Sequence, residues 1–447
     1  NQRIEFKLND EYRISADTSE SEYVLETDVD KDESYPIKIT FYNPGSHAHV
    51  GSFSIKWGWE GQSKTEVPSG KLYHTSKEEE KFSFIEDIDP KSVDKSQFIY
   101  PKVENVVVYY EKGRFAAFPA NSGIWNWGNE ILVGFLHAYN KENKYHHAID
   151  LTKPSHPALA RSTDGGESWS NEDPSIYFEN KKKRKLTKKM NFMHPGFALR
   201  FIGNRFFFSY DKGKSWKGPY LYQNFGFRRL SSRTDYIVDS EDECFVFISC
   251  KDKKVRGSLK DRAMSTKTTN GGLDFEFVGW MSELDSIRSV MPATVRINEN
   301  HLVSAMRRRL NPPRIKKYEF PQNWIDVYES QDNGKTWQFL SKIANTDRGK
   351  RNGDSPSMVK LKNGLLCVVY GYRGIPYSIR AKVSADNGKT WSKEIILRDD
   401  ARIWDIGYSR SVVRDDDKVV SIYYYSTEER TERHIAATIW DPTKINN

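Results

Sequence analysis

Short apolar runs separated by polar turns recur along most of the chain. Examples are Arg205–Phe208 and Ile325–Tyr328, which each lead into a turn, and Gln338–Leu340 and Lys393–Leu397, which each follow one. Runs of four to eight residues rich in β-branched and aromatic side chains and bounded by Gly, Asn and Asp are typical of β-strands. The pattern therefore predicts an all-β protein built from hairpins.

One turn sequence repeats between these runs, with the pattern S-x-D-x-G-x-[S/T]-W. It occurs at residues 162–169, 209–216, 330–337 and 384–391, and a weaker copy lies at 268–275. The Asp can hydrogen-bond the following backbone, the Gly supplies a positive φ, and the Trp can fill the apolar space beneath the turn. We expect Asp164, Asp211, Asp332 and Asp386 to be structural and to lie at peripheral turns.

The spacing of these turns predicts the architecture. Successive Asp positions are 47, 59, 62 and 54 residues apart, and periods of this size with several short strands per unit are typical of a β-propeller. Six inner strands are expected to begin the blades, near residues 115–119, 193–197, 233–237, 290–294, 355–359 and 407–411. We predict six blades over residues 101–447, or seven if residues 1–100, a β-rich module or added outer strands, supply another.

The repeated turn resembles that of the Asp-box, or sialidase-like, β-propellers over residues 101 to 447. The resemblance implies the fold, while the reaction is left open because unrelated activities share this scaffold.

Charge and composition restrict the kinds of binding partner that we expect. The chain carries 69 basic and 61 acidic residues, a net charge of +8, and part of the excess lies in the basic run at residues 181–189. This run is interpreted as a solvated loop or as a surface that attracts a polyanion. No motif that stacks on or reads nucleic acid accompanies it, so an acidic polysaccharide is the expected partner.

Other features of the sequence argue against a membrane span, a disulfide framework and a metal site. No run of 18 apolar residues is present, so no membrane span is predicted. Three cysteines make no disulfide framework, and their spacing indicates no metal site. We expect a monomer without cofactor or metal. It is expected to be secreted or periplasmic, with an export signal that is not part of this chain.

Inner strands of a propeller converge on one end of the central channel, so residues where they begin, and in adjoining loops, are candidates for a site. Five candidates can carry protons: His146, His147, His194, Tyr236 and Tyr408. Four are candidates for binding substrate: Arg114, Arg233, Arg410 and Asp354. For each one the alternative is a structural hydrogen bond at a strand end.

Two groups within the resembled family imply different chemistry. Sialidases use three arginines, a Tyr–Glu pair and an Asp acid/base. Here Arg114, Arg410 and one of Arg228, Arg229 or Arg233 could form the clamp, but no Tyr–Glu pair can be assigned and histidines dominate the acid/base loop. By residue type and blade position, the chain is more similar to the uronate-eliminating enzymes, such as ulvan lyases and related enzymes acting on ulvan fragments. We expect a lyase or dehydratase acting by β-elimination on an acidic glycan. The alternatives are a sialidase-type hydrolase and a non-catalytic glycan-binding propeller.

Overall fold

The computed structural model describes residues 93–143, 146–172, 182–227, 229–252, 254, 261–310, 322–347 and 353–445, and five strands before residue 67. The chain divides into two compact units, residues 1–84 with 312–320 and residues 85–311 with 321–447. In the first unit, β1 (Arg3–Leu8) pairs with both β2 (Glu11–Asp17) and β3 (Ile37–Tyr42), and β4 (Lys56–Trp57) pairs with β5 (Thr65–Glu66). Most of residues 1–100 lies outside the described residues, and the predicted boundary of this module stays a prediction.

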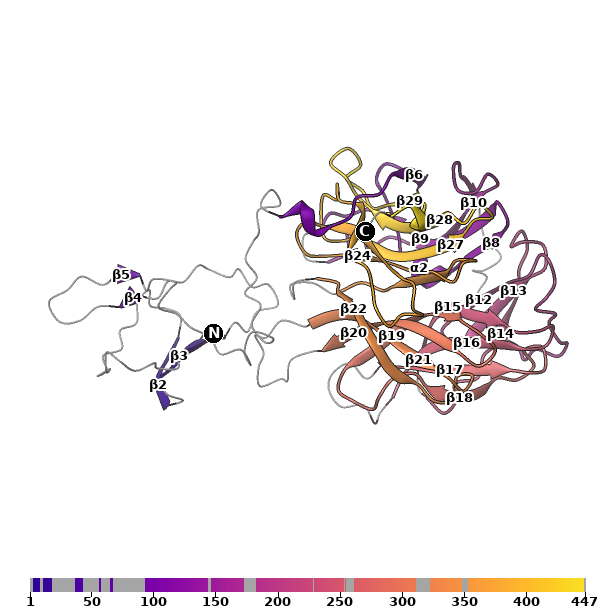
Figure 1. The fold of residues 1–447 in the computed structure, drawn as a ribbon, viewed down its shortest axis with the longest axis horizontal. Helices are drawn as coiled ribbons and strands as arrows, with labels where there is room; N and C mark the ends of the chain where they lie inside the picture. The colour runs from indigo at the N-terminus through magenta and orange to yellow at the C-terminus, as the bar shows by residue number, and fades with distance from the viewer. Residues whose placement is uncertain are drawn as a thin grey trace. The chain divides into compact units, whose positions relative to one another are not determined.

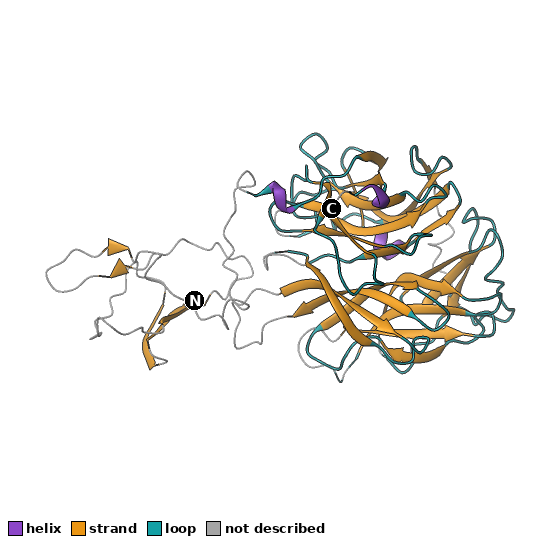
Figure 2. Cartoon of the chain, in the orientation of Figure 1, coloured by secondary structure: helices purple, strands orange, loops and turns teal. Residues whose placement is uncertain are grey.

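The second unit is a six-bladed β-propeller, as predicted (Figures 1 and 2). Each blade is an antiparallel sheet, and the first strands of neighbouring blades contact one another around the centre of the ring. Blade 1 consists of β7 (Arg114–Ala117), β8 (Ile124–Trp127), β9 (Glu130–Tyr139), β10 (His156–Ser162) and β11 (Ser170–Glu172). Blade 2 consists of β12 (Ala198–Ile202), β13 (Arg205–Ser209) and β14 (Lys217–Leu221). Blade 3 consists of β15 (Leu230–Val238), β16 (Cys244–Lys251), β17 (Asp261–Thr268) and β18 (Glu276–Trp280).

Blades 4 to 6 follow the same order. Blade 4 consists of β19 (Arg288–Arg296), β20 (Leu302–Leu310), β21 (Gln322–Ser330) and β22 (Gln338–Asn345). Blade 5 consists of β23 (Ser357–Lys360), β24 (Leu366–Tyr372), β25 (Ser378–Ser384) and β26 (Ile395–Arg398). Blade 6 consists of β27 (Gly407–Val413), β28 (Val419–Tyr425), β29 (His434–Trp440) and β6 (Val103–Tyr109). The outer strand of blade 6 is thus the first strand of the propeller, and the ring closes where β6 pairs with β29 (Figure 1).

The repeated turns form the hydrogen bonds expected from their sequence. In the last one the Asp386 carboxylate accepts from the Thr390 amide at 2.9 Å and from the Thr390 hydroxyl at 2.6 Å, and the Ser384 hydroxyl donates to it at 2.7 Å. Gly388 has φ +91°, which a side chain would strain. The other three full copies make the same set of bonds.

The ring has two rims with different roles. The turn rim carries the repeated turns and the ends of the first strands; there Arg296, the last residue of β19, donates to Asn333 of a repeated turn at 3.0 Å. The opposite rim carries the beginnings of the first strands and the ends of the second strands, and we call it the Tyr408 rim. The structural aspartates of the turns therefore lie at the other end of the ring from Tyr408.

A one-turn helix closes the centre of the ring. The first strand of blade 1 is interrupted after β7, and α2 (Pro119–Ser122) packs against β15 and β27 before the chain resumes as β8. Phe118 makes the turn into α2 with φ 64°. The prediction that residues 115–119 form one strand is thus wrong at Phe118 and Pro119, because Pro fixes φ and favours the first helical position.

Candidate active site

Tyr408 lies near the start of β27 in a strained backbone conformation. Its φ is +51°, and its amide donates to both oxygens of the Asp354 carboxylate at 2.9 and 3.0 Å. The amide of Gly371 donates to the same carboxylate at 2.7 Å. Gly407 lies so close that a Cβ there would be 2.1 Å from Asp354 Oδ2. A fully buried carboxylate therefore holds Tyr408 in a left-handed conformation that bulky residues adopt only at a cost.

Three arginines surround the Tyr408 side chain. Arg307 comes from the end of β20 and its Nη1 lies 3.4 Å from the Tyr408 hydroxyl, while the Arg373 guanidinium, just after β24, lies 5.4 Å from the centre of the ring. Arg233 comes from β15. Burial would raise the pKa of Tyr408, but the charges of Arg307, Arg373 and Arg233 together lower it below its usual value. The phenol is thus poised to ionise more readily than an ordinary tyrosine.

Positive charge is concentrated at this rim. Arg309 and Arg288 face the same region, and burial with the nearby Arg307 and Arg288 lowers the pKa of Arg309 to about 10. Arg288 has a carboxylate partner in Asp261 at 2.8 Å. Guanidinium groups that destabilise one another's charge in a buried setting favour an anionic ligand, because its charge relieves their repulsion.

A histidine–aspartate pair lies beside the tyrosine. His147 Nδ1 is 2.6 Å from Oδ1 of Asp405, and about a third of the His147 side chain is exposed. Asp405 is fully buried, and it also accepts from the Tyr424 hydroxyl at 2.6 Å and from Arg433 at 3.2 Å. Burial would raise the pKa of Asp405, but the hydrogen bond and charge of His147, with the arginines, lower it to about 2. The ionised Asp405 orients the imidazole and leaves Nε2 to exchange a proton.

Phe118 joins the histidine to the tyrosine. Its ring centre is 4.9 Å from that of His147 and 5.3 Å from those of both Tyr408 and Tyr424. The Arg373 guanidinium donates to the Tyr424 hydroxyl at 2.9 Å. His147, Tyr408 and the arginines therefore belong to one packed constellation at the Tyr408 rim, drawn from blades 1, 3, 4, 5 and 6.

Three of the predicted proton carriers lie elsewhere. His146 is exposed, and its amide donates to Asn143. His194 lies in a turn before β12, where its Nδ1 accepts from the Gly196 amide at 3.1 Å and its ring packs on Tyr210. Inner strand 2 begins at Ala198 rather than at the predicted 193, because the His-Pro-Gly sequence forms a turn. Tyr236 packs among apolar side chains of blades 2 and 3, and burial raises its pKa.

The predicted arginines also separate. Arg233 lies in the constellation, whereas Arg114 is on the surface, 3.9 Å from the ring centre of Tyr139, and Arg229 is exposed. Arg228 lies outside the described residues. Arg410 crosses the centre of the ring instead of facing the rim: its Nη2 donates to the carbonyl groups of Ala120 and Thr234 at 3.2 Å. Asp354, predicted to bind substrate, has its carboxylate occupied by backbone amides, so in this structure it positions Tyr408.

Sequence reasoning missed the residues at the ends of second strands and before β27. Arg307 and Arg309 belong to a run of three arginines near the end of β20, and the alternation of a strand places both on the face opposite to Arg308. That run was the available signal. Arg373 follows Tyr372, the last residue of β24, and Asp405 lies two residues before β27; neither has a local sequence signal.

The basic run lies apart from this site. Arg184 pairs with the outer strand of blade 2 at Tyr220, and Lys182, Lys183 and Lys185 are exposed, while Lys181 lies outside the described residues. Among the residues that the structure describes, no group of three or more His, Cys, Asp or Glu side chains is arranged to hold a metal ion. No helix in the described part of the chain has the length and apolar character needed to cross a membrane.

Comparison with known proteins shows similarity in fold. No family model and no curated protein sequence matches the chain. A protein of unknown function from Dyadobacter fermentans DSM 18053 is similar in structure, with a TM-score of 0.57 and 20% identity over 77% of this chain and 99% of that chain. The GH93 α-L-arabinofuranosidase of Fusarium graminearum gives 0.48 at 13% identity (77% and 99% covered), and the NanB sialidase of Streptococcus pneumoniae gives 0.47 at 8% (76% and 71%). At these identities the likeness extends to the fold alone.

Proposed function

We propose that the protein is a carbohydrate-active enzyme that cleaves or dehydrates an acidic, uronate-containing glycan by β-elimination at the Tyr408 rim. The observation that carries the proposal is the buried Tyr408, whose pKa the charges of Arg307, Arg373 and Arg233 lower against the effect of burial, beside the His147–Asp405 pair. A carboxylate sugar would complement the excess of guanidinium groups, and Arg binds carboxylates with two parallel hydrogen bonds.

The residues divide into roles that balance the reaction. The arginines neutralise the uronate carboxylate and so acidify the adjacent C5–H bond. Tyr408, as tyrosinate, takes that proton, the electron pair forms the C4=C5 double bond, and the C4–O bond breaks. His147, protonated on Nε2, gives its proton to the departing oxygen while Asp405 holds Nδ1. The products are an unsaturated uronate and a free hydroxyl group, and no further reactant is required.

A sialidase-type hydrolase is the second candidate, because an arginine-surrounded tyrosine could also attack an anomeric carbon. That mechanism needs a carboxylate to activate the phenol. Among the described residues, no carboxylate hydrogen-bonds the Tyr408 hydroxyl: Asp354 binds the backbone amide of Tyr408 instead. Because only positive charges activate Tyr408, we infer that it acts as a base and not as a nucleophile.

The test is incubation with uronate-containing oligosaccharides and polysaccharides, followed by near-ultraviolet absorbance and by reducing-end release. Elimination with chain cleavage creates a conjugated chromophore, whereas hydrolysis releases reducing ends without one, and a dehydratase acting on an unsaturated sugar consumes the chromophore. Tyr408→Phe should lower turnover by about 100- to 10,000-fold, the usual cost of losing a general acid or base. Tyr220→Phe, in the outer strand of blade 2, is the matched control and should keep full turnover. Release of reducing ends without any change in absorbance would contradict the lyase proposal and support the hydrolase. The absence of any reaction on acidic glycans would contradict both proposed activities.

A further inference from the structure

The basic run is held against the outer edge of blade 2. Arg184 pairs in parallel with Tyr220 of β14, and the Leu221 amide donates to the Arg184 carbonyl at 2.8 Å. Farther along the run, Leu186 and Met190 are buried in the apolar core that blades 2 and 3 share, and the Met190 amide donates to a backbone carbonyl of the blade 3 turn at 2.8 Å. The backbone that carries these cations is therefore fixed before any partner binds, which lowers the entropy lost on binding.

Five exposed cationic side chains lie along this segment, and we call them the basic edge: Lys182, Lys183, Arg184, Lys185 and Lys188. None of the five forms an ion pair with a carboxylate of the described part of the chain, whereas the neighbouring Lys189 pairs with Asp242 at 2.7 Å. Successive members are at most about 11 Å apart along an extended backbone, which is close to the screening length of about 10 Å at 0.1 M salt. Their charges therefore add to one local positive field.

Blade 2 adds a further cation beside the basic edge. Arg205 begins β13, is exposed, and pairs with Leu221, the residue whose amide holds Arg184. Arg205 likewise has no carboxylate partner among the described residues. A surface of like charges repels itself, so a polyanion that lies along it relieves this repulsion.

The chemistry of the surface favours a polysaccharide over a nucleic acid. Single-stranded nucleic acids bind basic grooves in which the bases stack on open aromatic rings. Tyr220, the aromatic residue paired with the basic edge, is 92% buried, and the Arg184 guanidinium lies 5.1 Å from its ring centre, so this ring has no open face. Lysine ammonium groups act as point charges, and they suit the carboxylate or sulfate groups of a flexible acidic polysaccharide.

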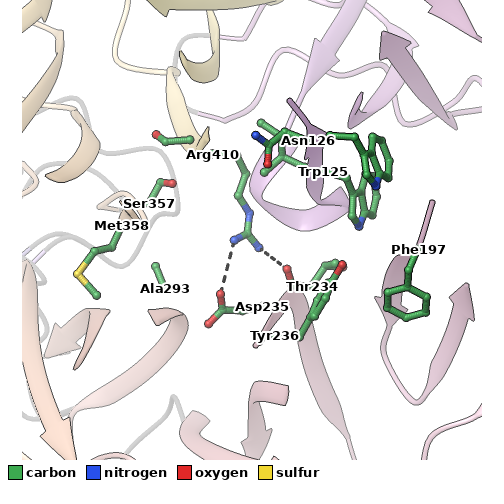
Figure 3. A pocket seen from close by; sticks show the side chains of 13 residues that line it. Trp125, Asn126, Phe197, Thr234, Asp235, Tyr236, Ala293, Ser357, Met358 and Arg410 are labelled. Atoms are coloured by element: carbon green, nitrogen blue, oxygen red, sulfur yellow. Dashed lines mark hydrogen bonds and ion pairs between the residues drawn. The ribbon is translucent and has the colours of Figure 1, made fainter. Parts of the chain in front are cut away.

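The cavity at the centre of the ring does not compete for such a partner. Its volume is about 300 Å³, and it is lined in part by Arg410, whose Nη1 lies 4.0 Å from Asp235 Oδ1 (Figure 3). The same guanidinium donates to the carbonyl groups of Ala120 and Thr234. The positive charge of Arg410 is thus engaged inside the ring, whereas the basic edge is open to solvent.

We propose that the basic edge is a binding surface for an acidic polysaccharide, separate from the Tyr408 rim, that holds the protein on its polymer. The choice of a glycan rests on the proposed function, whereas the positive surface itself does not depend on it.

The probes are polygalacturonate, which carries carboxylates, and dextran sulfate, which carries sulfates, with neutral dextran as the comparison. Binding to the full chain is measured at low salt by biolayer interferometry, with Tyr408→Phe as the background so that the polymer is not degraded. Combining Lys183→Gln, Lys185→Gln and Lys188→Gln should weaken binding of the acidic polymer about 3- to 100-fold, the usual contribution of three exposed ion pairs. The affinity of this variant should also depend less on salt, because fewer counterions are released.

The matched control combines Lys335→Gln, Lys389→Gln and Lys393→Gln, which removes the same charge from exposed lysines of blades 4 and 5. It should leave polymer binding nearly unchanged. Urea unfolding checks that both triple variants are folded, and Lys185→Gln alone should give a smaller change in the same direction if the first triple variant does not fold.

The proposal is overturned if neither acidic polymer binds, if neutral dextran binds equally well, or if the two triple variants weaken binding equally. It is also overturned if a short DNA duplex binds the basic edge more tightly than either polysaccharide. Failure of the proposed function gives a different result: the acidic polymer binds through the basic edge, but the wild-type protein neither changes its absorbance nor releases reducing ends. Turnover of the polymer together with unchanged binding in the first triple variant would contradict the binding surface alone.

Discussion

Asp354→Asn should disable the Tyr408 rim without dismantling the propeller. The Asp354 carboxylate accepts from the amides of Tyr408 and Gly371 at 2.7 to 3.0 Å and lies 3.5 Å from Arg373. Asparagine can accept with one oxygen only, and its NH₂ would face an amide donor. Hydrogen bonds to a charged group contribute about 1.5–3 kcal/mol each, and losing one partner of a buried ion pair costs about 3–5 kcal/mol. We expect the free energy of unfolding to fall by about 3–5 kcal/mol.

The effect on turnover should exceed what this destabilisation explains. Without its acceptor the Tyr408 backbone is free to leave φ +51°, a conformation that costs about 1–3 kcal/mol, and the phenol then leaves the arginines that lower its pKa. Turnover of the folded protein should drop at least 100-fold, and the alkaline shift of its pH profile should reveal the lost influence of the arginines. Stability is measured by urea unfolding and turnover on the best acidic glycan.

Asp326→Asn is the matched control for Asp354→Asn. Asp326 is also buried and lies on β21, the third strand of blade 4, where its carboxylate is 3.4 Å from Arg308 of β20. None of its contacts in the described part of the chain is with a residue of the constellation. It should lose comparable stability and keep its turnover. Normal turnover in folded Asp354→Asn, or an equal loss of turnover in both variants, would refute the positioning role.

Three further expectations follow from the structure. Asp386→Ala removes the acceptor of the Thr390 amide and of two hydroxyls and should cost about 1–3 kcal/mol of stability while sparing turnover; a large loss of turnover at full stability would contradict the structural role of the repeated turns. His434 is 99% buried, and burial lowers its pKa from 6.5 to about 4. Because only the unfolded chain binds the proton between these pH values, the free energy of unfolding should fall by about 3 kcal/mol as the pH drops from 6.5 to 4. In His434→Gln, the free energy of unfolding measured in urea should depend less on pH over that range, and an unchanged dependence would contradict the prediction. Binding of an acidic glycan should weaken with added salt, since exposed charges are screened over about 10 Å at 0.1 M; an affinity independent of salt would remove the electrostatic argument.

The fold could be predicted because its signals are local. Each repeated turn is specified by side chains within eight residues, and the Asp386 bonds to Ser384 and Thr390 need nothing from the rest of the chain. The spacing of such turns then indicates a propeller, and the six inner-strand signals give the blade count. The error at Phe118 and Pro119 has two causes: Pro119 locally favours the first helical position, and the space at the centre of the ring that α2 fills is set by the other blades.

The site could be predicted only in part. Tyr408, Arg233 and His147 follow from the rule that first strands and adjoining loops converge on one rim. Arg373 could not be found in this way, since it lies at the end of a second strand and reaches Tyr408 through the tertiary arrangement of two blades. His194 was predicted at the start of an inner strand, but it lies in a local turn in which its Nδ1 accepts a hydrogen bond from the Gly196 amide.

The pairing of β6 with β29 governs how the chain can be made. The Thr438 hydroxyl bonds Asn105 across a separation of 333 residues, so β6 leaves the ribosome long before its partner exists. At about 5–20 residues per second, β6 waits roughly 15 to 70 seconds with an unsatisfied edge. Such long-range closure is slow, and an open strand edge invites pairing with other nascent chains. Synthesis at low temperature, or with a chaperone that shields extended segments, should therefore raise the yield of closed rings.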